Sequence, residues 1–172
     1  IIAEGAPRPT ELAAEELQTY VEKMTGARLP IGPKPSDPAA NRIYVGRSRF
    51  TDELGIGVDE LKHGAFHVKS GENWLALVGK DKTFVPVEPA PRSHGDFPRV
   101  MAEWDKITGE QFGYPYRQLY KEYHRDLGIW EKDERGSFNA VVHFLRTQGV
   151  RWFVPHEIGK VVPEKASIAL PK

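Results

Sequence analysis

The chain of 172 residues has the size of one domain, and by general scaling it should bury roughly 70% of the surface that its unfolded form exposes. Its 24 basic side chains balance its 24 acidic ones, which argues against a protein that binds nucleic acid or a charged membrane surface. It has no cysteine and no apolar run near the roughly 20 residues of a membrane span, which excludes disulfides, thiolate chemistry, cysteine-bound zinc and a transmembrane helix.

The first predicted helix begins at Thr10 and ends at Gly26. Thr10 follows Pro9 and is a suitable N-cap, and acidic side chains follow it where the helix dipole favours them. Gly26 is the residue type that commonly ends a helix in the left-handed conformation. Apolar side chains recur with the helical period and form one stripe, which contains Ala13, Leu17, Tyr20, Val21 and Met24.

Strand patterns come before and after this helix. Residues 1–3 are predicted to end one β-strand and residues 41–46 to form another, which makes a parallel β-α-β unit. Residues 51–62 have the character of a short helix or turn. The alternating runs at 65–69 and 74–78 surround a turn sequence and predict an antiparallel hairpin. The sheet is therefore expected to be mixed.

The character of the sequence changes between residues 82 and 134, and we interpret this segment as an insertion. Prolines are frequent at its start, and aromatic and charged residues dominate the rest. Residues 99–108 and 116–127 have helical content and are separated by glycine and proline. The insertion is therefore predicted to be largely helical.

The last part of the chain predicts one more helix and one more strand. Ser137 is a suitable cap for a helix that ends before Gly149, and residues 150–154 read as a strand that Pro155 stops. Together the elements predict a single α+β domain over residues 1–172. We expect a two-layer sandwich, in which helices cover mainly one face of a small mixed β-sheet, with the insertion added to it.

Five segments in the same order resemble the non-catalytic N-terminal domain that precedes the catalytic barrel in several glycoside hydrolases. The segments are Glu11 to Ile31, Ile43 to Gly46, Leu75 to Asp81, Arg135 to Leu145, and Gly149 to Pro163. Similar domains occur in family 20 β-N-acetylhexosaminidases, in family 67 α-glucuronidases and in related bacterial proteins of unassigned activity. There the strand that matches Leu75 to Asp81 leads almost directly into the following helix, whereas residues 82–134 intervene here.

The resemblance implies that the reaction takes place outside this chain. In the family the catalytic carboxylates lie in the barrel, so no catalytic residue, cofactor or metal is expected in these 172 residues. The implied partners are the barrel of the same parent chain and a polysaccharide or oligosaccharide. A secreted or periplasmic location is also implied, because polysaccharide-degrading enzymes of this kind usually work outside the cytoplasm.

Aromatic residues of the insertion are candidates for carbohydrate binding, because flat side chains stack on the apolar faces of sugar rings. The candidates are Trp104, Tyr114, Tyr116 and Trp130. An alternative stays open, since Tyr116, Tyr120 and Tyr123 have the helical spacing of a buried stripe. Core packing would leave such residues unavailable to a sugar.

The last predicted strand offers a candidate contact with the barrel. Trp152 alternates with Arg151 and Phe153, so one face of this strand should be core. We expect Arg151 or Trp152 to contact the partner barrel.

Metal binding or catalysis by the chain itself has less support. His63 and His67 are four residues apart, but Gly64 and the strand pattern after it deny them a common helix face. A hydrolase site would have to be assembled by tertiary structure, from His94, Asp96, His124 and Asp126.

Three functions are therefore open. The first is an accessory domain that docks on a glycoside hydrolase barrel and shapes its substrate entrance through the insertion. The second is a free-standing carbohydrate-binding module that uses the aromatic residues of the insertion. The third is a small hydrolase. The resemblance favours the first.

Overall fold

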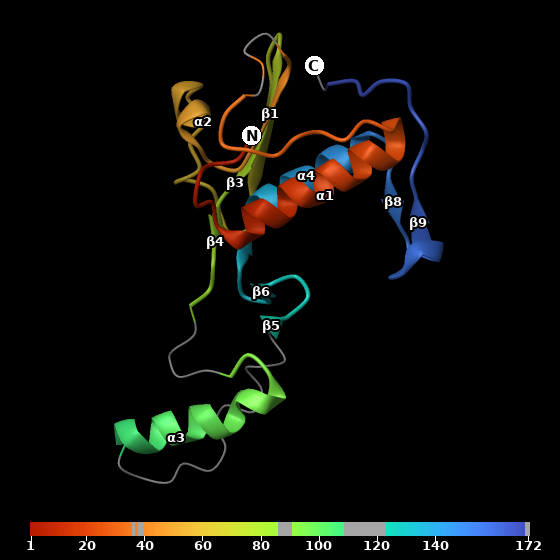
Figure 1. Ribbon diagram of the computed structural model, residues 1–172. Helices are drawn as coiled ribbons and strands as arrows, with labels where there is room; N and C mark the ends of the chain where they lie inside the picture. Colours follow the sequence, from red (N-terminus) through yellow and green to blue (C-terminus); the bar gives the residue numbers. More distant parts are fainter. Residues whose placement is uncertain (36, 38–39, 86–90, 109–122, 171–172) are drawn as a thin grey trace. The chain divides into compact units, whose positions relative to one another are not determined.

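The chain forms two compact units in the computed structural model, which describes residues 1–35, 37, 40–85, 91–108 and 123–170 (Figure 1). Unit 1 contains Ile1–Lys82 and Glu134–Lys172, and unit 2 contains Thr83–Asp133. The boundaries of unit 2 differ by one residue at each end from those of the expected insertion. Helices and small sheets occur together, so the predicted α+β class is confirmed.

The main sheet of unit 1 has the strand order β1-β3-β2. β1 (Arg42–Val45) pairs in parallel with β3 (Trp74–Gly79), and β2 (Phe66–Ser70) pairs antiparallel with β3. The predicted hairpin and the mixed sheet are therefore confirmed. Residues 1–3 form no strand, although Ile1 lies beside β1: its amino group donates to the carbonyl of Ile43 at 2.6 Å, and its carbonyl accepts from the N–H of Val45 at 2.9 Å.

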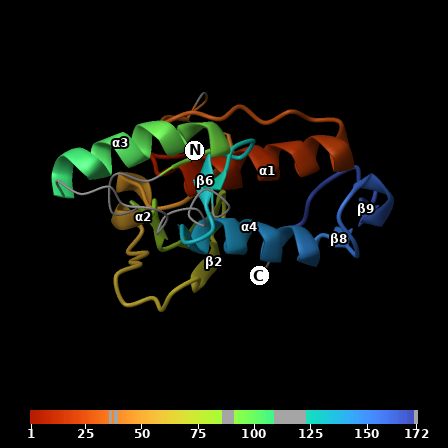
Figure 2. The same ribbon diagram turned by 90° about the horizontal axis from the view of Figure 1, so that it is seen from below.

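Two long helices cover one face of this sheet. α1 (Arg8–Thr25) and α4 (Gly136–Thr147) lie side by side in both views (Figures 1 and 2). Their apolar stripes pack on the strand residues of that face to form the larger core. Its buried members include Leu17, Tyr20, Val21, Met24, Val45, Leu75, Leu77, Val141, Phe144 and Leu145. The stripe predicted for the first helix is thus the face that α1 buries.

The opposite face of the sheet is covered as well. Tyr44, Ala76 and Val78 point to this side and pack with Ile56 and Val58, which follow the short helix α2 (Arg49–Glu53). α2 is shorter than the expected 51–62 element: it ends at Glu53, and Gly55 follows Leu54 with a φ of 67°, which is not helical. Because α1 and α4 cover one face of the sheet and the segment after α2 covers the other, the expected two-layer sandwich is not confirmed.

β3 and α4 make a close crossing that only glycine allows. A Cβ atom added to Gly79 would lie 2.3 Å from the carbonyl carbon of Gly136, and one added to Gly136 would lie 2.6 Å from the backbone nitrogen of Lys80. A hydrogen bond also connects α4 to β3 at the crossing: the hydroxyl of Ser137 accepts from the N–H of Gly79 at 2.9 Å. The start of α4 is therefore fixed directly on the end of the central strand.

Asp81 connects this crossing to α1. One carboxylate oxygen accepts from the N–H of Ser137 at 2.9 Å and the other from the hydroxyl of Thr10 at 2.7 Å. Burial raises the pKa of Asp81, although both hydrogen-bond partners act to lower it. The predicted cap roles of Thr10 and Ser137 are wrong: α1 begins at Arg8 after Pro7, and α4 begins at Gly136, so both hydroxyls bond to other elements.

Short strands complete unit 1. β4 (Asp81–Lys82) pairs antiparallel with β7 (Glu134–Arg135), immediately before and after the segment that forms unit 2. β8 (Arg151–Trp152) pairs antiparallel with β9 (Lys160–Val161), and the 3-10 helix η3 (Glu157–Gly159) lies between them. Figures 1 and 2 both place this hairpin at the C-terminal ends of α1 and α4.

Unit 2 combines a helix with a small hairpin in its described part. η1 (His94–Asp96) leads directly into α3 (Phe97–Thr108), which confirms the helical prediction for 99–108. β5 (Tyr123–His124) pairs antiparallel with β6 (Ile129–Trp130). The helix expected over 116–127 is wrong at its end, where β5 begins, and the rest of that range lies outside the described residues.

Candidate functional site

A pocket of about 580 Å³ lies within unit 2. Its walls come from two loops, residues 92–94 before α3 and residues 123–127 at the turn between β5 and β6. A volume of this order is typical of sites for small molecules. The pocket brings together side chains from two parts of the chain that the sequence gives no reason to join.

The first loop is fixed by Asp96. Its carboxylate accepts from the backbone N–H of Arg92 at 3.0 Å and lies 3.8 Å from the guanidinium of Arg99 on α3. The imidazole of His94 packs edge-on against Phe97, with the ring centroids 5.4 Å apart. Arg92 and His94 are therefore held on the pocket wall by contacts behind it.

The second loop is fixed by its hairpin. Tyr123 pairs with Trp130 across the two strands, and their ring centroids are 4.8 Å apart. The N–H of Gly128 donates to the carbonyl of His124 at 2.8 Å, with Gly128 at a φ of 68°, where glycine is favoured. His124 also lies 3.9 Å from the carboxylate of Glu131. The turn that carries the pocket residues is thus held in place by contacts within the β5-β6 hairpin.

Trp130 belongs to strand β6 of this hairpin, and its side chain is buried. Its side chain is only 3% exposed, and it packs against Tyr123 and Phe84. Asp133 accepts from the backbone N–H groups of Trp130 and Phe84, at 2.8 and 2.5 Å. The expectation that Trp130 stacks on a sugar is therefore wrong, because neither ring face is accessible. Tyr123 is the aromatic residue on the described wall of the pocket, and the guanidinium of Arg92 lies over its ring.

Cationic and hydrogen-bonding groups dominate the pocket. The guanidinium of Arg92 lies over the ring of Tyr123 at 5.7 Å, and Arg125 stands on the turn. In the part of the chain that the structure describes, neither guanidinium pairs with a carboxylate. Asp126 is the one carboxylate on the described wall, and His94 and His124 supply further hydrogen-bonding nitrogens. Such a set can bind an anionic group and hydroxyl groups at the same time.

Three of the four residues considered for a hydrolase site meet in this pocket. His94, His124 and Asp126 line it, whereas Asp96 lies behind Arg92 and faces Arg99. Among the residues described, no three His, Asp or Glu side chains are grouped so that they could hold a metal ion. The two arginines were missed from the sequence, because isolated arginines belong to no recognisable motif.

The other sequence-predicted carbohydrate contacts are not in the pocket. Trp104 lies on α3 with its side chain partly buried, and it does not line the pocket. Tyr114 and Tyr116 lie outside the described residues.

An apolar patch lies at the tip of the β8-β9 hairpin in unit 1. Ile158 is 93% exposed and Phe153 73% exposed, Val154 is also exposed, and Val161 is exposed on the adjoining strand β9. Phe153 donates its N–H to the carbonyl of Gly159 at 2.8 Å, and a Cβ atom on Gly159 would lie 2.3 Å from the carbonyl oxygen of Val154. The tip is therefore tightly folded while its large side chains point to solvent.

Arg151 and Trp152, the predicted barrel contacts, have different surroundings. The indole N–H of Trp152 donates to the hydroxyl of Tyr20 at 2.6 Å, and the two rings meet edge to face at 5.1 Å. Trp152 thus packs on the core of its own unit. Arg151 is exposed, and its guanidinium bonds the carbonyl of Arg146 at 2.7 Å. In the sequence Phe153 alternates with Trp152, and this alternation is the signal that could have identified Phe153 as exposed.

Charged side chains border the apolar patch. The carboxylate of Glu157 lies 2.6 Å from the ammonium of Lys160 and 3.6 Å from that of Lys23, and these cations lower the pKa of Glu157. Burial raises the pKa of the neighbouring Glu16, while Lys160 and Lys23 act in the opposite direction. The patch therefore has an apolar centre and a polar rim, which is the composition of an interaction surface.

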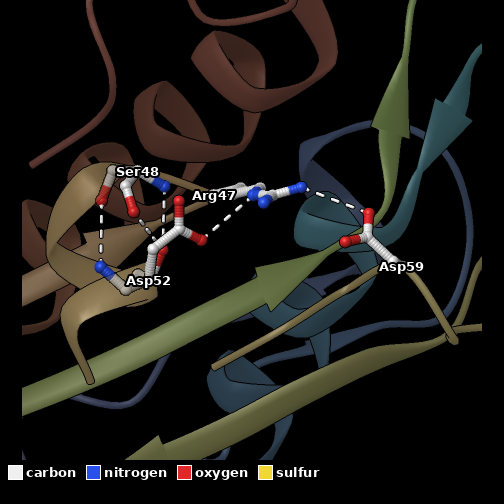
Figure 3. Close-up of polar contacts among 5 residues, drawn as sticks. Arg47, Ser48, Asp52 and Asp59 are labelled. Carbon is white, nitrogen blue, oxygen red and sulfur yellow. Dashed lines mark hydrogen bonds and ion pairs between the residues drawn. The ribbon is translucent and has the colours of Figure 1, made fainter. Parts of the chain in front are cut away.

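A second polar cluster lies beside α2. Figure 3 shows the guanidinium of Arg47 between two carboxylates, 3.0 Å from Asp52 and 3.2 Å from Asp59, and these partners raise the pKa of Arg47. The side chain of Ser48 accepts from the N–H of Thr51 and so caps α2. The charged groups of Arg47, Asp52 and Asp59 pair with one another, and these contacts fix α2 and the loop that follows it.

No helix in the described part of the chain combines the length and the apolar character that crossing a membrane requires. Searches against protein families, curated proteins and solved structures found no match to this chain.

Proposed function

We propose that the chain is a non-catalytic accessory domain of a glycoside hydrolase, in which the β8-β9 hairpin docks on a following barrel of the same parent chain. The observation that supports this function is the exposure of four large apolar side chains in one short hairpin: Phe153, Val154 and Ile158 at its tightly folded tip, and Val161 on β9. Large contiguous apolar patches on the surface of monomeric proteins are often interaction sites. The resemblance to glycoside hydrolase accessory domains supplies the partner.

The size of the patch suits a partner in the same chain. Burial of one large apolar side chain contributes roughly 1.5–3 kcal/mol, so Phe153 and Ile158 together would contribute a few kcal/mol. Two separate proteins need more than this, because association costs translational and rotational freedom. A covalent link raises the effective concentration of the barrel and removes much of that cost.

The test compares the parent protein with this chain expressed alone. Phe153→Asp and Ile158→Asp place charges on groups that face solvent in the isolated chain, so the thermal midpoint of that chain should change by less than about 2 °C. In the parent protein the same changes should separate the unfolding of this domain from that of the barrel, as measured by calorimetry.

Leu54→Asp is the matched control, because Leu54 is also apolar and exposed in unit 1 but lies after α2. It should leave the coupling of the two domains intact. Unchanged coupling in both hairpin variants would contradict docking at this site. Dimerisation of the isolated chain that Ile158→Asp abolishes would assign the patch to self-association instead.

A second function, carbohydrate binding, is favoured by the pocket of unit 2. Tyr123 presents an aromatic ring on its wall, and Asp126, His94 and His124 offer groups that hydrogen-bond to hydroxyls. This combination of a flat apolar surface with polar neighbours suits a sugar ring. Calorimetric titration of the chain with oligosaccharides tests it, and the absence of measurable binding to any of them would contradict it.

A further inference from the structure

We propose that the pocket of unit 2 binds an acidic sugar residue, whose carboxylate or sulfate group is held by Arg92 and Arg125. The inference rests on the proposed carbohydrate-binding function and adds the chemical class of the ligand. Both arginines line the same pocket of about 580 Å³, which is large enough for a monosaccharide unit with its neighbours.

The charge of the two arginines is available to a ligand. Asp96, the acidic residue nearest to the first loop, accepts from the backbone N–H of Arg92 and lies beside the guanidinium of Arg99. Glu131 lies beside His124. Arg125 makes no ion pair with any residue that the structure describes. An oxoanion would therefore give these guanidinium groups the charge-assisted hydrogen bonds that they lack.

The remaining wall suits the ring of a sugar better than a bare ion. Trp130 packs against the ring of Tyr123 and the guanidinium of Arg92 lies over it, so Tyr123 contributes a firmly held and partly covered aromatic wall. Asp126 would repel a free anion, but its carboxylate can accept hydrogen bonds from hydroxyl groups. A ligand that carries both an anionic group and hydroxyls satisfies every one of these side chains, whereas inorganic sulfate or phosphate leaves Asp126 unfavourably placed.

The test is a titration of the complete chain with three probes of equal length. These are a hexasaccharide of galacturonic acid, a sulfated carrageenan hexasaccharide and the neutral cellohexaose. We expect binding of at least one acidic probe that weakens with added salt and is at least tenfold tighter than binding of cellohexaose. The galacturonate and carrageenan probes distinguish a carboxylate ligand from a sulfate ligand.

Variants locate the site. Arg92→Gln and Arg125→Gln should each weaken binding of the acidic probe about tenfold, since each removes charge-assisted hydrogen bonds. Lys106→Gln, which removes the same charge from an exposed position on α3 outside the pocket, should have no effect. Asp126→Asn should weaken binding of the hexasaccharide but strengthen binding of inorganic sulfate.

The outcomes separate the two proposals. Equal affinity for cellohexaose and the acidic probes would overturn the acidic-sugar inference and leave carbohydrate binding standing. No binding of any probe would overturn both. Wild-type affinity in Arg125→Gln, or an equal loss in Lys106→Gln, would show that the pocket is not the site and would also overturn the inference. Circular dichroism of each variant identifies any loss that comes from unfolding.

Discussion

Asp81 is the residue on which the two long helices of unit 1 converge. Its carboxylate accepts one hydrogen bond from Ser137 of α4 and one from Thr10 of α1. It also lies close to the N-terminal end of α4, where the helix dipole favours a negative charge. A single side chain therefore joins the end of β3 to the starts of both helices.

Replacement of Asp81 tests this role. Asp81→Ala leaves the hydroxyl of Thr10 and the N–H of Ser137 without their acceptor, and it should lower the free energy of unfolding by about 2 kcal/mol or more. Asp81→Asn should cost less, because an amide oxygen can accept from Ser137 while the amide nitrogen donates to Thr10. Urea denaturation of the three proteins measures the difference, and equal losses in both variants would contradict it.

The pH dependence of the same comparison has a defined sign. Burial raises the pKa of Asp81 in the folded protein, so its protonated form contributes stability that is complete below the unfolded pKa of roughly 3.9. That contribution is lost as the pH rises through the folded pKa. The wild-type free energy of unfolding should therefore fall relative to that of Asp81→Asn as the pH rises from about 3.5. The opposite slope would mean that the hydrogen bonds outweigh burial.

His156 is strained at the hairpin tip. It has a φ of 84° and a ψ of 162°, a conformation that is favourable only for glycine. His156→Gly should therefore raise the free energy of unfolding by about 1 kcal/mol, which corresponds to roughly 2–4 °C in the thermal midpoint. Differential scanning calorimetry measures this shift. His156→Ala is the control, because it removes the imidazole but keeps the strain, and stabilisation in both variants would attribute the effect to the imidazole.

Among the elements, those that depend on neighbouring residues were predictable from the sequence. The alternation of β2 and β3 and the stripe of α1 are local periodic patterns, and Gly26 closes α1 at a φ of 74°. The elements that depend on distant residues were not predictable. β4 pairs with β7, and β5 occupies part of a range with helical spacing, because tertiary pairing outweighs local propensity there. The pocket was not predictable for the same reason, because its lining residues come from two segments that are distant in the sequence.

The crossing of α4 over β3 depends on two glycines. Gly79→Ala would place its Cβ atom 2.3 Å from the backbone of Gly136, where no flexible side chain can move aside. The helix must shift, and we expect a loss of about 3 kcal/mol in the free energy of unfolding. Gly32→Ala is the control, because its Cβ atom would meet nothing within 4 Å. Chemical denaturation compares the two, and a loss below about 1 kcal/mol in Gly79→Ala would contradict the crossing.

At the scale of the whole molecule, the chain passes from unit 1 into unit 2 and returns to unit 1 at the neighbouring position. Lys82 and Glu134, the residues on either side of it, face each other as a cross-strand pair of β4 and β7. The three-stranded sheet and the larger core belong to unit 1. The proposed docking surface and the proposed ligand pocket thus lie in different units, which makes the two proposals separable by mutation.

Deletion of residues 83–133 tests this separation. Because Lys82 and Glu134 are directly paired, an Asn-Gly dipeptide between them should form a two-residue hairpin turn. We expect the shortened chain to keep the fold of unit 1, with a thermal midpoint within about 5 °C of the full chain, and to lose all affinity for the acidic hexasaccharide. Circular dichroism, two-dimensional NMR and calorimetry measure the three properties. A Pro-Pro linker is the control, since proline cannot adopt the positive φ of such a turn, and it should lower the midpoint. A shortened chain that fails to fold, or that still binds the hexasaccharide, would contradict the division into two units with separate roles.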